Sequence, residues 1–259
     1  MSFAASTAVM QRRIEAPDSL DDFPTPPWAT RALCEVLTGE GYDLAQMSAW
    51  EPCCNRGHMA RPLAEAFGSV FASDVMNYGW PGQQAVADFL IDWAQDVPEV
   101  DFVITNPPFR LAAEVIARGL ERARRGVAVF VRTAFVEGVS RYETLFRDQP
   151  EALVLPFVER VVLWRGVLLD PEVPVWREGP DGTGRAERPT SATSYCWLVW
   201  LKGRDGPTVL RRIPPCRPRL TRPGDYPALP AHLAPPLSAA PSLPLTLEDQ
   251  SPRRPAWTS

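Results

Sequence analysis

The stretch that decides the fold is DFVITNPPF, residues 101–109. Its apolar first part indicates a buried strand, and the two prolines after it can continue neither a helix nor a central strand. The chain must therefore leave a sheet at the carboxyl end of a strand, where open α/β folds bind ligands. The Asn106 amide oxygen and the Pro107 carbonyl are acceptors and Phe109 has a flat ring, so together they could hold a planar group that carries an NH2. Asn-Pro-Pro is also common in turns, so the stretch alone leaves a plain strand-terminating turn open.

Strands and helices alternate around this stretch. Short apolar runs predict buried strands at Met47–Trp50, Val70–Ser73, Phe102–Thr105 and Val127–Val131. Amphipathic stretches predict helices at Trp28–Thr38, Met59–Phe67 and Leu111–Arg124. This alternation predicts an α/β fold with a mostly parallel sheet and helices on both faces. Three later strand-like segments, which we expect to complete the sheet as antiparallel partners, are Ala152–Leu155, Arg160–Trp164 and Ser194–Leu201.

The ends of the chain differ in composition from its middle. Residues 1–20 have no apolar periodicity, and we expect a flexible segment there; residues 21–205 form the predicted folded domain. Within that domain, residues 166–193 are polar and rich in Pro and Gly, which predicts a long loop of the kind that often carries function. The tail from Pro207 holds 13 of the 29 prolines, so residues 206–259 are predicted to form an extended, partly ordered arm.

Composition excludes several classes of protein. The chain has 259 residues and a net charge of -4, with no apolar run long enough to span a membrane and no secretion signal, so we expect a cytoplasmic protein. Its five cysteines lack zinc-ligand spacing, which predicts no structural metal. The charge is uneven: residues 1–109 hold 5 arginines against 15 acidic residues, whereas residues 160–222 hold 12 basic against 6 acidic. The second region could therefore face a polyanion.

Five short motifs follow one another along the chain. They are DFPTPP at 22–27, EPCCNRGH at 51–58, an aspartate after the second strand at 74, DF at 88–89 and NPPF at 106–109. In this order they resemble the motifs of class I S-adenosylmethionine-dependent methyltransferases that act on an exocyclic or amide nitrogen, above all N6-adenine DNA methyltransferases. The resemblance covers roughly residues 20–205 and implies a Rossmann-like methyltransferase domain there, with S-adenosylmethionine as cofactor, S-adenosylhomocysteine as product and no metal.

The resemblance also implies roles for individual residues. Thr25 and Pro26 would contact the methionine part of the cofactor, Asp74 the ribose hydroxyls, and Asp88 and Phe89 the adenine amino group and ring. The remaining cofactor residues would be Glu51, Pro52, Cys53, Asn55, Gly57 and Asn106, and the catalytic ones Asn106, Pro107, Pro108 and Phe109.

One position departs from the family pattern, since Asn55 stands where the family has its first glycine. Asparagine is the best non-glycine residue at positive φ, so we expect the turn to survive at a modest cost. Cys53 and Cys54 are predicted to be small packing residues rather than nucleophiles. For His58, a structural place in the first turn of a helix and a cofactor contact both remain open.

The motif order matches the γ arrangement of DNA adenine methyltransferases, but the chain has no room for their large target-recognition domain. It resembles the short enzymes carried by phages and prophages, so we expect DNA as partner, duplex with a flipped adenine or single-stranded, and low or very short sequence specificity. Phe135 is predicted to line the target pocket, with core packing as its alternative. The arginines available for phosphates are Arg165, Arg177, Arg185, Arg188, Arg211, Arg212, Arg217 and Arg219.

Three other functions remain open at this point. RNA adenine-N6 methyltransferases share the NPPF motif, and nothing in the sequence separates RNA from DNA. Protein glutamine-N5 methyltransferases have a related motif but usually a GxGSG-type cofactor loop, which this chain lacks. The last alternative is a catalytically inactive relative that binds nucleic acid, and Asn55 is the one feature that favours it.

Overall fold

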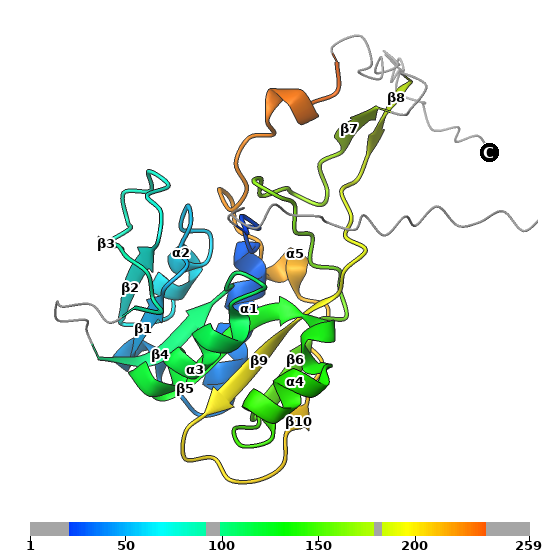
Figure 1. The fold of residues 1–259 in the computed structure, drawn as a ribbon. Coiled ribbons are helices and arrows are strands. Elements are labelled where there is room, and N and C mark those ends of the chain that lie inside the picture. Colours follow the sequence, from blue (N-terminus) through cyan, green and yellow to red (C-terminus); the bar gives the residue numbers. More distant parts are fainter. Residues whose placement is uncertain (1–20, 92–98, 179–182, 237–259) are drawn as a thin grey trace, which may run out of the picture. The chain divides into compact units, whose positions relative to one another are not determined.

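The computed structural model describes residues 21–91, 99–178 and 183–236 (Figure 1). The predicted flexible segment 1–20 and the end of the tail, 237–259, lie outside these ranges. The described residues divide into two compact units. The first holds residues 21–173 and 188–228, and the second holds the rest, from 174–187 and 229–236.

The first unit is built on an eight-stranded sheet in the order β3-β2-β1-β4-β5-β9-β6-β10. Seven strands are parallel to one another, and β9 runs antiparallel to its neighbours β5 and β6. The strands are β1 Ser48–Glu51, β2 Ser69–Asp74, β3 Ala85–Val86, β4 Val100–Thr105, β5 Ala123–Arg132, β6 Leu153–Pro156, β9 Tyr195–Leu201 and β10 Val209–Leu210. The predicted mostly parallel sheet is thus confirmed. Of the later strands that were expected to be antiparallel, β9 is antiparallel to the sheet, whereas β6 is antiparallel to β9 and therefore runs parallel to the other strands.

Helices cover both faces of the sheet, because successive strand residues point to opposite sides. Phe102 and Ile104 of β4 pack in one apolar cluster with α1, whereas Val103 packs in another with α3. The helices are α1 Pro27–Gly39, α2 Ala60–Ala64, α3 Ala112–Arg122, α4 Val139–Arg141 and α5 Arg217–Leu220, with a π-helix at Tyr142–Phe146 and 3-10 turns at Leu44–Gln46, Thr133–Val136 and Ala231–Leu233. Among the described residues, no helix has the length and apolar character needed to cross a membrane.

The prediction of a strand at Arg160–Trp164 is wrong. This segment is irregular, and Val161 and Leu163 fill the same apolar cluster as α1. Its apolar pattern therefore reflects core packing by a loop. Glu159, just before it, accepts hydrogen bonds from the backbone N–H groups of Cys216 and Arg217, so the chain is held by contacts outside any sheet ladder.

Two segments predicted to be irregular contain regular structure. The loop 166–193 includes an antiparallel hairpin, β7 Val175–Glu178 with β8 Gly184–Glu187, which belongs to the second unit. The first part of the Pro-rich tail forms β10 and α5 and belongs to the first unit, where Ile213 and Leu220 are buried in the core. An edge strand of two residues and a helix with proline in its first turn need few backbone donors, so the prolines are tolerated there.

A buried arginine connects the tail to the helices. The Arg31 guanidinium, on α1, donates to both oxygens of Glu65 at 2.7 and 2.8 Å and to both oxygens of Asp225 at 2.6 and 2.8 Å. It also donates to the Leu220 carbonyl at 2.7 Å. Because Arg31 and Asp225 are both buried, loss of the arginine would leave a carboxylate without its cation.

We expect Arg31→Met to lower the free energy of unfolding by about 3–5 kcal/mol, since one partner of a buried ion pair is removed. Urea denaturation followed by circular dichroism measures this change. The control is Arg219→Met, which breaks the exposed, solvent-screened pair with Glu35 and should lower the free energy of unfolding much less. Equal losses in the two variants would show that the buried position of Arg31 adds no stability.

Candidate active site

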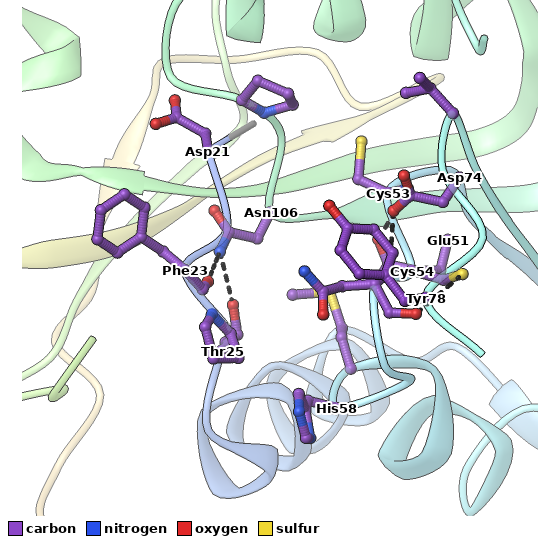
Figure 2. Close-up of a pocket in the computed structure, with 15 residues that line it drawn as sticks. Asp21, Phe23, Thr25, Glu51, Cys53, Cys54, His58, Asp74, Tyr78 and Asn106 are labelled. Carbon is purple, nitrogen blue, oxygen red and sulfur yellow. Dashed lines mark hydrogen bonds between the residues drawn. The ribbon is translucent and has the colours of Figure 1, made fainter. Parts of the chain in front are cut away.

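A pocket of about 600 Å3, counting space open to solvent, lies where β1, β2 and β4 end (Figure 2). The segment before α1 closes it from the other side. Of the predicted site residues, those that line it are Thr25, Glu51, Cys53, Asn55, Asp74, Asn106 and Pro108. Residues that line it and were not assigned a site role from the sequence are Asp21, Phe23, Pro24, Cys54, Met59, Val75 and Tyr78, and His58 joins them.

Asn106 follows β4 and is fixed by its amide nitrogen. Nδ2 donates to the Phe23 carbonyl at 2.8 Å and to the Thr25 hydroxyl oxygen at 2.9 Å, as Figure 2 shows. These two acceptors use both amide hydrogens and so determine which way the amide is turned. Oδ1 accepts no hydrogen bond from the part of the chain that the structure describes. Asn106 therefore presents an acceptor at the pocket.

Phe109 is held just outside the pocket. Its N–H donates to Asp21 Oδ2 at 2.7 Å, and its ring lies 5.7 Å from that of Phe23, tilted by 31°. The Arg132 guanidinium, at the end of β5, stacks over the ring at 4.2 Å from its centre. A planar ligand that stacked on this face would have to displace Arg132.

Glu51 is a buried carboxylate at the end of β1. Oε1 accepts from the Thr105 hydroxyl at 2.6 Å and from the Cys53 N–H at 3.3 Å. Oε2 is buried and has no hydrogen-bond partner among the described residues. Burial raises the pKa of Glu51 to about 8, although the two hydrogen bonds oppose that shift. A cation beside Oε2 would stabilise the ionised form.

The loop after β1 has the backbone expected of it. Asn55 has φ of 48° and is the sole non-glycine residue at positive φ in the described ranges, so the expected left-handed turn is confirmed. Its N–H donates to Asp74 Oδ2 at 2.9 Å, and its side chain donates to Asp22 at 2.7 Å. Gly57 has φ of 78°, and a Cβ there would meet the Trp80 ring at 2.3 Å, so a larger residue would be strained and would clash. The loop is thus tied both to β2 and to the segment before α1.

Two further side chains give the pocket polar and aromatic character. His58 is buried with Nδ1 unpartnered among the described residues, and burial lowers its pKa to about 4, so it is neutral at pH 7. Tyr78 follows β2, with the Arg56 guanidinium 5.4 Å from its ring centre, and burial raises its pKa to about 12. The sequence left two roles open for His58; for Tyr78 no motif gave a signal.

The two cysteines of the loop are thiols. Both are free, and burial raises the pKa of each above its ordinary range. A protonated thiol is a poor nucleophile, which agrees with their predicted packing role.

Several predicted site residues lie outside the pocket lining: Pro26, Pro52, Gly57, Asp88, Phe89, Pro107 and Phe109. Phe89 is buried and packs edge-on against Trp50, 4.9 Å away, rather than facing the pocket. Asp88 is exposed and accepts from the Leu90 N–H. Neither side chain lines the pocket, although the Ala87 N–H donates to the Asp74 carbonyl at 2.8 Å and so places the pair beside Asp74. Tyr78 and Val75 are the side chains beyond β2 that line it.

Most of the arginines predicted to contact nucleic acid form ion pairs with glutamates of the protein. Arg177 and Arg185 pair with Glu187 in the hairpin, Arg188 and Arg217 with Glu172, Arg211 with Glu40, and Arg219 with Glu35. Arg165 and Arg212 are exposed and have no carboxylate partner in the described ranges. Phe135 is half-buried against Phe146 with Arg141 over its ring, so it packs on the core, the alternative that the sequence left open.

The chain was compared with known structures. The methyltransferase subunit of a type I restriction-modification system from Streptococcus thermophilus matches with a TM-score of 0.50 and 12% identity, over 75% of this chain and 48% of that one. A protein of Listeria monocytogenes described as a class I S-adenosylmethionine-dependent methyltransferase matches with a TM-score of 0.46 and 11% identity, over 70% of this chain and 64% of that one. Magnesium protoporphyrin IX methyltransferase of Synechocystis PCC 6803 matches with a TM-score of 0.40 and 14% identity, over 68% of this chain and 79% of that one. The sequence matches no protein-family model and no curated protein.

Strand order and structural similarity together define the class of fold. The chain has the Rossmann-like fold of class I S-adenosylmethionine-dependent methyltransferases, as the motif order predicted. It spans about half the length of the Streptococcus subunit, 48%.

The raised pKa of Glu51 predicts a pH-dependent stability. The folded protein holds a proton on Glu51 that the unfolded chain releases above about pH 4.3, so stability should fall as the pH rises toward 8, by up to about 1.4 kcal/mol per pH unit. Glu51→Gln keeps an acceptor for Thr105 but cannot ionise. Urea denaturation at pH 5, 6.5 and 8 measures the free energy of unfolding, which should rise in the variant relative to the wild type with each increase in pH. If the difference between the two proteins is the same at all three pH values, Glu51 titrates near its ordinary pKa.

Proposed function

We propose that this protein is an S-adenosylmethionine-dependent methyltransferase that methylates the N6 amino group of adenine in DNA, with low or very short sequence specificity. The observation that carries the proposal is the orientation of Asn106. Its amide nitrogen is bound on both hydrogens, so its oxygen is the atom that meets a ligand. An acceptor followed by a proline carbonyl suits a substrate NH2.

The residues present fit S-adenosylmethionine. That cofactor carries a sulfonium and an ammonium, and the buried, unpartnered Oε2 of Glu51 is a site for a cation. The unpartnered ring nitrogen of His58 could hydrogen-bond the cofactor carboxylate, and Asp74 keeps lone pairs for ribose hydroxyls beyond those used by the loop. Tyr78 offers a ring at the same side of the pocket. Bound there, the cofactor would supply an electrophilic methyl group.

Asn106 and Pro107 would activate the substrate nitrogen. The lone pair of an adenine amino group is delocalised into the ring, so the nitrogen is planar and a poor nucleophile. Hydrogen bonds from its two N–H groups to Asn106 Oδ1 and the Pro107 carbonyl favour the more tetrahedral nitrogen of the transition state. Because Thr25 and Phe23 hold the Asn106 amide, its Oδ1 needs no reorganisation during the reaction.

DNA is proposed as the substrate on the motif order and on the site. The amino group of a paired adenine is inside the duplex, so the base has to leave the stack to reach Asn106. Phe109 offers it a ring once Arg132 moves aside. A fold neighbour is a restriction-modification methyltransferase subunit, which makes DNA the first substrate class to test. RNA, protein glutamine and an inactive binding role are the outcomes that would replace the proposal.

We expect Asn106→Ala to lower methyl transfer to DNA by at least about 100-fold, because the variant can no longer make an interaction that forms mainly in the transition state. Cofactor affinity, measured by calorimetry, should stay within a few-fold. Thr25→Val is the matched control, since it removes one acceptor of the Asn106 amide and leaves Oδ1 in place; we expect a decrease of about tenfold or less. Equal decreases of cofactor binding and transfer in Asn106→Ala would make Asn106 a structural residue.

Glu51→Gln should weaken S-adenosylmethionine binding by at least about tenfold, because the cofactor cation loses its buried partner. In the wild type, affinity should rise between pH 6 and 7.5 as Glu51 releases its proton, by up to about tenfold per pH unit. The variant should show no such rise. Calorimetric titrations across this range measure both, and an unchanged dissociation constant would remove Glu51 from the cofactor site.

A further inference from the structure

We propose that a row of arginines at the carboxyl edge of the sheet binds the phosphates of the DNA strand whose base enters the pocket. The row consists of Arg110, Arg132, Arg160, Arg165 and Arg212, and is called the arginine rim below. The inference rests on the proposed function and names the surface that receives the DNA. It differs from the sequence prediction, which placed phosphate binding mainly on arginines that the structure finds in ion pairs.

Sheet topology places the rim. Arg110 follows the NPPF loop after β4, and Arg132 is the last residue of β5, where it pairs with Tyr195, the first residue of the antiparallel β9. Arg160 donates to the Ser194 hydroxyl at 3.2 Å, just before β9 begins. Since β9 enters the sheet at this edge, Arg160 lies on the same edge as Arg132.

The other two arginines are placed by neighbouring backbone bonds. The Ile213 N–H donates to the carbonyl of Pro156, the last residue of β6, at 2.9 Å, which puts Arg212 beside that end of β6. The Gly166 N–H donates to the Asp22 carbonyl at 2.8 Å, which puts Arg165 beside the segment that closes the pocket. The rim therefore runs from the pocket across β4, β5, β9, β6 and β10.

The rim arginines are not paired with a carboxylate in the described part of the chain. No carboxylate of the described residues lies within ion-pair distance of any of the five, whereas the predicted contacts Arg177, Arg185 and Arg211 are all paired. Four of the five are exposed, and the Nε of Arg132 is buried without an acceptor among the described residues. Uncompensated cations of this kind attract a polyanion.

Charge changes along the edge. Of the three carboxylates that line the pocket, Glu51 and Asp74 stand at the ends of β1 and β2, where a cationic cofactor is proposed, and Asp21 accepts the N–H of Phe109. The rim occupies the strands on the other side of Asn106. Three of the five rim arginines, Arg160, Arg165 and Arg212, come from the basic region 160–222 of the sequence.

The rim has the length of a short strand of DNA. From β4 to β10 there are four strand intervals, and at about 4.8 Å each they span about 19 Å. Phosphates follow one another at about 3.4 Å along the axis of one DNA strand, so this length faces about five or six nucleotides. Arg132 joins the rim to the pocket, because it covers the ring of Phe109 and would be free for a phosphate once a base takes that place.

The test compares two double variants that each remove two positive charges. Arg160→Ala with Arg212→Ala acts on the rim. Arg125→Ala with Lys202→Ala acts on the opposite edge, where β5 begins and β9 ends; both cations are exposed and have no carboxylate partner in the described ranges. Binding of a fluorescein-labelled, unmethylated 20-base-pair duplex is followed by anisotropy between 50 and 300 mM NaCl with S-adenosylhomocysteine present. Cofactor affinity checks that each variant is folded.

We expect the rim variant to bind at least about tenfold more weakly at 100 mM salt. Its slope of log Kd against log salt should be lower by about 1.8, since each phosphate that the protein no longer neutralises lowers the slope by about 0.9. The control should bind within about twofold of the wild type.

Two results would overturn the inference while wild-type methylation of DNA still upholds the proposed function. Equally weakened binding in both variants would show a net-charge effect, and unchanged binding in the rim variant would show that phosphates bind elsewhere. Wild-type protein that neither binds nor methylates DNA would overturn both the inference and the proposed function.

Discussion

The site depends on the short segment that crosses the carboxyl edge of the sheet before α1. Asp21 holds the Phe109 N–H, Asp22 holds the Asn55 side chain, and the Phe23 carbonyl with the Thr25 hydroxyl holds the Asn106 amide. These bonds join loops that follow β1 and β4 and are far apart in the sequence. Without them Asn106 could turn either face of its amide to the pocket, and nothing would select the acceptor over the donor. The segment therefore determines the chemistry that the edge can perform.

A second constraint is electrostatic. Glu51 is buried at the end of β1, and one of its carboxylate oxygens has no hydrogen-bond partner among the described residues. The folded protein is therefore less stable when Glu51 is ionised than when it is protonated. Such an arrangement costs stability and is explained by a cation that arrives from outside the chain. On the other side of Asn106, the arginines of the rim have no carboxylate partner among the described residues. One edge of one sheet thus offers a negative place and a positive surface, with the proposed reaction between them.

Much of the fold was predictable because its signals are local. Apolar runs gave the buried strands to within two residues for β1, β2 and β4, and two prolines after β4 fixed the edge at which the site lies. The positive φ of Asn55 followed from its residue type and place in the loop. Contacts set by the tertiary structure were not predictable: Tyr78 has no motif, Phe89 turns to Trp50, and the segment Arg160–Trp164 is apolar because it packs on the core. Nor does the sequence show which arginines have carboxylate partners, because those pairs join residues that are distant along the chain.

The central claim is methyl transfer to the amino nitrogen of adenine, and product identification tests it most directly. Purified protein is incubated with unmethylated genomic DNA and S-adenosylmethionine that carries a labelled methyl group, and the DNA is digested to nucleosides for mass spectrometry. The account predicts labelled N6-methyladenine from many sequence contexts. Label on another base, or label on RNA or protein with none on DNA, would contradict it.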